Sequence, residues 1–196
     1  MNRELFVKVS TFSGILCPIV SYFCIFLAIS KAPWFRWEEN ALSDLGAHTG
    51  SDVIFNGGLI IGGILLLVFA VWLIFYFEDI IAKIGSFILS IDSIALSLIG
   101  VFPETFGRIH LYVSIAFFVL FPIAYLIISI SLFMYHREKL LGILAVIGAV
   151  ASIIIWSFPW KSYGITGVAI PEFLSSLFGS LWVMTAAIKI YLKTRK

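Results

Sequence analysis

Charged side chains are scarce in this sequence. Asp, Glu, Lys and Arg make up 12% of its 196 residues, whereas hydrophobic residues make up 61%. A soluble domain of this length carries roughly 25% charged residues. The shortage of charge excludes an ordinary soluble domain, and nothing in the sequence indicates nucleic-acid binding.

Cysteine is also rare. The two cysteines, Cys17 and Cys24, lie seven residues apart in one apolar run. On a helix this spacing separates their Cα atoms by about 10 Å along the axis, whereas a disulfide needs Cα atoms within about 7 Å. We therefore expect two free, apolar side chains and infer no redox compartment from them.

The chain is instead rich in long apolar runs, each close to the roughly 20 residues that cross a bilayer. Helices are expected at residues 5–30, 53–77, 81–102, 110–135, 140–158 and 171–191. The first run is too long for a signal-peptide core and lacks a clear small-residue cleavage site. The sequence predicts an all-α fold, a polytopic membrane bundle of six transmembrane helices, forming a single transmembrane domain over residues 1–196.

The basic residues predict the orientation of this bundle. Six spans place both termini on one side, together with the short connections at residues 78–80 and 136–139. That side carries nine basic residues: Arg3, Lys8, Lys83, Arg137, Lys139, Lys189, Lys193, Arg195 and Lys196. The side with the three longer connections carries four: Lys31, Arg36, Arg108 and Lys161. Because basic residues favour the cytoplasmic side, we expect cytoplasmic termini in an inner or plasma membrane.

The first long connection contains the segment "NALSDLG", with Asn40, Ser43 and Asp44 close together on the expected outer side. Two interpretations are open. These side chains hydrogen-bond to the backbone of an irregular segment, or the segment dips between helices and presents Asp44 to a ligand.

A Pro-Glu pair occurs twice on the expected outer side. In "FPETFGRIH" a proline would open a helix with Glu104 in its first turn, where the helix macrodipole favours an anion. Glu104 and Arg108 are spaced for an ion pair on one helix face, and His110 follows just inside the membrane boundary. In "IPEFL", Glu172 repeats the pattern. Each of these residues has a structural as well as a functional interpretation.

Asp92 lies in the middle of an expected span, within "SFILSIDSIALSLIG". A carboxylate at that depth is costly unless it is protonated or paired, which makes it a candidate functional residue. The alternative is a neutral Asp92 hydrogen-bonded to hydroxyl groups of the same helix. No second charged residue is expected at this depth, so the sequence does not predict a proton relay.

Small residues predict where helices approach closely. Gly58 and Gly62 form a GxxxG pair, which we assign to packing inside the bundle. A second stripe of small residues runs along the third expected helix: Ser86, Ser90, Ser93, Ser97 and Gly100.

Few sites of known chemistry can be assembled from these residues. We expect no metal and no cofactor, since there is no Gly-rich phosphate loop and no facing histidine pair for haem. His48, His110 and a carboxylate are the one set with metal-ligand residue types. Ser43, His110 and a carboxylate have the residue types for nucleophilic catalysis, but no nucleophile-elbow pattern surrounds Ser43. Whether the protein is an enzyme stays open.

Three motifs together resemble a known family. "NALSDLG", "GVFPETFGRIH" and "GITGVAIPEFLSSLFGSLW", in this order and within six expected helices, resemble the prokaryotic membrane family called domain of unknown function 998. That family is more distantly similar to Frag-, DRAM- and Sfk-type membrane proteins, which carry an Ile-Ser-Asp-x-Gly segment where this chain has "LSDLG". Some of those relatives are linked to lipid and GPI-anchor processing or to membrane trafficking.

The resemblance implies one outer-facing group of residues: Asn40, Ser43, Asp44, Gly46, Glu104, His110 and Glu172. It supplies no reaction. Where the resemblance implies an acidic-basic pair early in the last helix, this chain has Glu172-Phe173, so a guanidinium partner would come from elsewhere, with Arg108 the candidate.

These observations lead to a first hypothesis of function. An outer polar pocket binds or processes a lipid or lipid-linked head group. Asp44, His110 and Glu172 are its candidate catalytic residues, and Asn40, Ser43, Glu104 and Arg108 its candidate ligand-binding residues. The alternative is a non-catalytic accessory subunit that contacts other membrane protein subunits. A third hypothesis, a transporter that uses Asp92, requires a water path to mid-membrane.

Overall fold

The computed structural model describes residues 3–194, and its regular elements are all helical. Six helices are long and apolar enough to cross a membrane, as predicted. They are α1 (Arg3–Ser30), α2 (Asp52–Tyr76), α3 (Ile80–Val101), α4 (Arg108–Met134), α5 (Lys139–Ser157) and α6 (Ala169–Thr194). Three short 3-10 helices lie in the longer connections: η1 (Leu42–Gly46), η2 (Glu104–Phe106) and η3 (Trp160–Tyr163).

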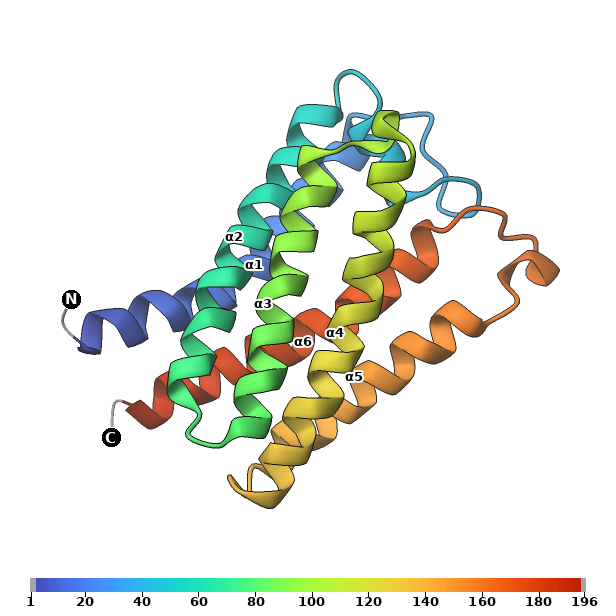
Figure 1. Cartoon of the computed structure of the whole chain (residues 1–196). Helices are drawn as coiled ribbons and strands as arrows, with labels where there is room; N and C mark the ends of the chain where they lie inside the picture. Colours follow the sequence, from blue (N-terminus) through green and yellow to red (C-terminus); the bar gives the residue numbers. More distant parts are fainter. Residues whose placement is uncertain (1–2, 195–196) are drawn as a thin grey trace.

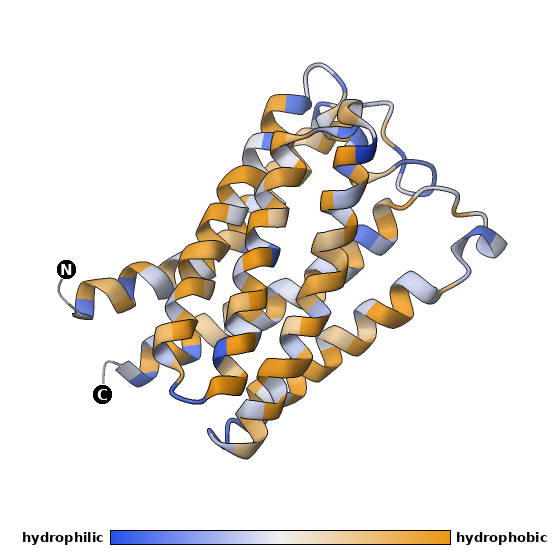
Figure 2. Ribbon diagram, viewed as in Figure 1, coloured by the Kyte–Doolittle hydropathy of each residue, from blue (hydrophilic) through white to orange (hydrophobic). Residues whose placement is uncertain are grey.

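The six helices form a closed ring. Each packs against its neighbours in the chain, and α6 returns to pack against α1. Figure 1 shows that the α2–α3 and α4–α5 turns lie at the same end of the bundle as the start of α1 and the end of α6. The three 3-10 helices lie at the opposite end, here called the η1 end. Hydrophilic residues gather at the two ends, and hydrophobic residues cover the helices between them (Figure 2).

Glycine and serine allow close helix approach, as the sequence predicts. A Cβ atom built on Gly58 would lie 2.2 Å from the Cβ atom of Cys24 on α1. On the other face of α2, a Cβ atom on Gly63 would lie 2.2 Å from the hydroxyl of Ser97 on α3. The predicted GxxxG helix and serine stripe therefore pack inside the bundle.

Charged side chains tie the turns together at the end opposite η1. Asp79 caps the N-terminus of α3 by accepting from the backbone N–H of Ala82 (2.9 Å), and it also accepts from the Ser131 hydroxyl (2.7 Å) and contacts His136 Nε2 (2.9 Å). Glu138, before α5, pairs with two lysines of α6, Lys189 and Lys193. These contacts fix helix ends outside the apolar spans.

The start of α4 differs from the sequence prediction. Glu104 lies in the separate turn η2 and not in the first turn of α4, because Gly107 takes a φ of +58° and breaks the helix there. The break changes the direction of the chain between Glu104 and Arg108. Among residues 3–194, Arg108 makes no ion pair, so the helical pairing of these two residues is not formed.

Candidate functional site

Asp44 organises the "NALSDLG" segment. Its carboxylate accepts hydrogen bonds from the Asn40 side-chain amide (2.8 Å) and from the backbone N–H of Ala41 (3.0 Å). Its backbone carbonyl accepts from the His48 ring Nδ1 at 2.9 Å. These contacts of Asp44 are the ones that the structural interpretation of the segment expects, with side chains hydrogen-bonded to nearby groups of the same loop. Asp44 lines neither of the two cavities described below.

Asp44 also hydrogen-bonds to Glu104, carboxyl to carboxyl. This hydrogen bond, together with burial and the negative charge of Asp44, raises the pKa of Glu104 to about 7. Burial acts to raise the pKa of Asp44, but the hydrogen bonds from Glu104, Asn40 and Ala41 outweigh it and hold that pKa below its ordinary value. The shared proton therefore belongs to Glu104, which donates to an ionised Asp44.

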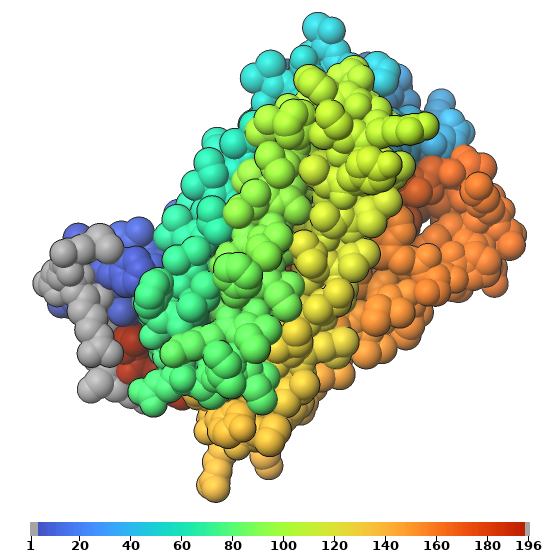
Figure 3. Space-filling model, viewed as in Figure 1, coloured from blue at the N-terminus to red at the C-terminus, as the bar shows by residue number. Residues whose placement is uncertain are grey.

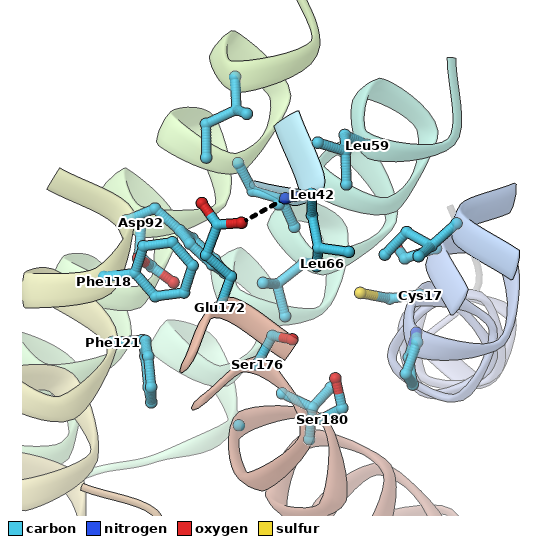
Figure 4. Close-up of a pocket in the computed structure, with 18 of the residues that line it drawn as sticks. Cys17, Leu42, Leu59, Leu66, Asp92, Phe118, Phe121, Glu172, Ser176 and Ser180 are labelled. Carbon is cyan, nitrogen blue, oxygen red and sulfur yellow. Dashed lines mark hydrogen bonds between the residues drawn. The ribbon is translucent and has the colours of Figure 1, made fainter. Parts of the chain in front are cut away.

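Glu172 holds η1 from the opposite side. It lies in the first turn of α6, and its Oε2 atom accepts a hydrogen bond from the backbone N–H of Leu42 at 2.7 Å (Figure 4). The chain before α6 docks on the same loop, because the N–H groups of Val168 and Ala169 both donate to the Asn40 carbonyl (3.1 and 2.9 Å). Glu172 thus receives a backbone N–H where the resemblance implied a guanidinium partner.

His110 is 7% exposed and is held in one tautomer. Its Nδ1 atom lies 2.8 Å from the Phe102 carbonyl oxygen, which can only accept, so Nδ1 carries the proton. The other nitrogen, Nε2, lies 3.3 Å from the Ser114 hydroxyl and is left as an acceptor. Ser114 is a site residue that the sequence analysis missed, although its spacing of four residues from His110 on one helix is a usable signal.

A cavity of about 870 Å³, here called the lateral groove, lies between α4 and α5. These two helices are close at their connecting turn and diverge toward the η1 end (Figure 1), and the space-filling view shows a hollow between them with α6 behind it (Figure 3). Polar residues line the η1 end of the groove: Ser43, Glu104, His110, Ser114 and Glu172. The rest of the lining is largely apolar, apart from Ser152 and Ser157 of α5, and includes Ile115, Val119, Ile123, Leu126 and Ile153.

A second cavity, the central chamber, has a volume of about 100 Å³ and lies inside the ring of helices (Figure 4). Every long helix except α5 contributes to its lining, and Asp92 lies on its wall. The groove and the chamber share four lining residues: Ser43, Ser114, Phe118 and Glu172. Two hydroxyls of the chamber that were not predicted, Ser176 and Ser180, follow Glu172 at intervals of four residues along α6.

The structure therefore divides the candidate residues into three places. Asn40, Ser43, Asp44, Glu104, His110 and Glu172 gather at the η1 end, Asp92 lies deeper in the central chamber, and Arg108 is exposed and lines neither cavity. Within residues 3–194 no group of three His, Cys, Asp or Glu residues is arranged to hold a metal ion.

A ring of six membrane-length helices, with a polar-ended groove between two of them, defines an integral, multi-pass membrane protein of the helical-bundle class. The chain belongs to the family described as "Protein of unknown function (DUF998)", whose model matches residues 15–189. This match confirms the resemblance inferred from the three motifs and includes all of them. The comparison with curated proteins found no match, and neither did the comparison with solved structures.

Proposed function

We propose that this protein binds a membrane lipid or lipid-linked molecule in the lateral groove, with the head group at the η1 end. The observation that carries the proposal is the division of one cavity into a polar end and an apolar length. Glu104, His110 and Glu172 line the polar end, while exposed apolar side chains of α4 and α5 line the length. An amphiphile needs a polar site for its head group next to an apolar surface for its chains. A groove between two membrane-spanning helices is open to the bilayer, so a lipid can enter it from the side.

The residues of the polar end favour a head group that donates hydrogen bonds. Glu172 offers one carboxyl oxygen beyond the one that accepts from Leu42, and His110 offers Nε2. Among the residues that the structure describes, no lysine or arginine lines the groove. A bare phosphate at this place would face carboxyl groups without a cation, whereas hydroxyl or amine groups would find acceptors.

If the head group is processed as well as bound, the roles of the residues follow from their positions. His110 Nε2 is the candidate base, since it is an acceptor that lines the groove. Glu104 is the candidate acid, since it carries a proton and lines the same end. Asp44 acts through Glu104 as a positioning residue, and Asn40 holds Asp44.

The test is the composition of lipid that stays with the purified protein. Ile153 and Val150 are both exposed on α5, but only Ile153 lines the groove. Ile153→Trp should fill the groove and remove a lipid species that the wild-type protein enriches over the surrounding membrane, while Val150→Trp should retain it. Liquid chromatography with mass spectrometry of extracted lipids measures both.

The enriched species should carry hydroxyl or amine groups in its head group. A lipid composition equal to that of the bulk membrane, unchanged by Ile153→Trp, would contradict the proposal.

A further inference from the structure

Asp92 is enclosed without hydrogen-bond partners. It is 1% exposed, and among residues 3–194 neither of its carboxyl oxygens has a partner. The hydroxyl of Ser21, which lines the same central chamber from α1, is also without one. Buried polar atoms in this state cost free energy unless water or another ligand reaches them. The chamber is the space from which such a ligand can reach Asp92 (Figure 4).

The chamber connects Asp92 with the η1 end. Its lining begins at Leu42 and Ser43 of η1, passes Glu172 and Asp92, and extends to Leu89, Tyr125 and Val183. A volume of about 100 Å³ holds several water molecules, each of which needs roughly 10–15 Å³ and two to four polar partners. Partners are present along the route: Ser21, Tyr22, Ser114, Ser176 and Ser180.

The opposite direction is closed by tightly packed side chains, which include small hydroxyl residues of α1 and α3 such as Ser10 and Ser86. The next turns of α2 and α4 beyond the chamber place Phe69, Leu73, Ile128 and Leu132 there, each at most 1% exposed. A small cavity near the α4–α5 turn, about 30 Å³, shares no lining residue with the chamber. Water can therefore reach Asp92 from the η1 end and not from the opposite end of the bundle.

We propose that Asp92 is a proton-binding site that exchanges with water through the central chamber, from the η1 end alone. The ligand is a proton and not a metal ion, because hard divalent cations take about six or more oxygen ligands. Asp92 and Ser21 are the chamber-lining residues with enclosed, unpartnered oxygens. The proposal does not depend on what the lateral groove binds.

The other titratable groups on the chamber wall are few. Cys17 and Tyr22 face it from α1, Tyr125 from α4 and Glu172 from α6. The lining residues of α2 and η1 are not titratable, and no lysine or arginine within residues 3–194 lines the chamber. No fixed cation therefore competes with a proton for Asp92.

Infrared spectroscopy of the full-length protein in phosphatidylcholine vesicles tests this proposal. A protonated carboxyl has a C=O stretching band apart from the amide bands, and the band shifts when its proton is replaced by deuterium. Glu104 also carries a proton up to about pH 7. Wild-type protein should therefore show, in addition to the Glu104 band, a band that Asp92→Asn removes and Asp92→Glu moves. After transfer to D₂O the band should shift, because the chamber admits water.

Two matched variants test the direction of access. Ser43→Leu narrows the chamber at the η1 end, whereas Ser157→Leu makes the same change at a residue that lines only the lateral groove. Exchange should slow at least severalfold in Ser43→Leu and stay at the wild-type rate in Ser157→Leu. The proposal would be overturned if Asp92→Asn removed no band, if the band that it removes did not exchange in D₂O, or if the exchange rate were the same in Ser43→Leu as in the wild type.

Discussion

Glu104 of η2 donates a hydrogen bond from its carboxyl group to the carboxylate of Asp44 in η1, which joins two loops at the same end of the bundle. The folded state keeps a proton on Glu104 up to about pH 7, whereas the ordinary pKa of this group is 4.5. Between these two pH values the folded state therefore binds more protons than the unfolded state. Stability should therefore fall as the pH rises between these values. Asp44 acts in the opposite sense, since its contribution is lost as the pH falls through its lowered pKa, below 3.8.

Thermal unfolding followed by tryptophan fluorescence measures this dependence. Glu104→Gln should lessen the decline between about pH 5 and about pH 7, because the amide donates to Asp44 at every pH. Glu39→Gln, a change at an exposed glutamate of the connection that contains Asp44, should leave the decline unchanged. An unaltered pH profile in Glu104→Gln would show that another group carries the effect.

Neighbouring glycines of α2 should respond in opposite ways to alanine. A Cβ atom on Gly58 would lie 2.2 Å from Cys24 Cβ, whereas a Cβ atom on Gly57 would meet nothing within 4 Å. Gly58→Ala should cost about 1–3 kcal/mol by overpacking, and Gly57→Ala should be neutral or stabilise by up to about 1 kcal/mol. Denaturant unfolding in mixed micelles gives the comparison, and equal effects of the two changes would refute the packing of α1 on α2.

The docking of the α6 entrance on the η1 loop depends on Gly167. A Cβ atom there would lie 2.3 Å from the Asn40 carbonyl oxygen and 2.5 Å from the Asn40 nitrogen. Gly167→Ala should destabilise the protein by about 1–3 kcal/mol, while Thr166→Ala, on an exposed neighbour, should change stability by less than about 0.5 kcal/mol. A fully stable Gly167→Ala protein would mean that this loop contact is not needed in the membrane.

The six helices were predictable because a chain that crosses a bilayer must satisfy its backbone groups within each span, which leaves long apolar runs in the sequence. The gathering of Asp44, Glu104, His110 and Glu172 at one end followed from the same count of spans. The hydrogen-bond partners of these residues could not be predicted in the same way. Glu104 meets Asp44 because Gly107 breaks the helix before Arg108, and a positive φ cannot be inferred from residue spacing alone.

The two cavities could not be predicted from the sequence either. The lateral groove depends on the divergence of α4 and α5, and helix periodicity does not encode the angle between two helices. Gly46 illustrates the same limit. This glycine allows a close approach that residue spacing does not reveal, since a Cβ atom there would lie 2.3 Å from Asn56 Oδ1.

The distribution of basic residues predicts cytoplasmic termini and an η1 end that faces outward. A membrane-impermeant maleimide added to intact cells tests this in a protein with Cys17→Ala and Cys24→Ala. Glu39→Cys, exposed near η1, should be labelled, and Glu78→Cys, exposed at the α2–α3 turn, should be labelled only after the membrane is permeabilised. The reverse pattern would invert the bundle and place the groove's polar end in the inner leaflet.

The most direct measurement of the central claim is native mass spectrometry of the protein gently extracted from its own membranes. We predict one amphiphilic molecule of defined mass per chain, retained in Glu39→Gln and lost in Glu172→Gln, which keeps an acceptor for the Leu42 N–H but removes the carboxyl group from the groove. Stoichiometric partner chains with no bound lipid would contradict a head-group site, and would favour the accessory-subunit hypothesis.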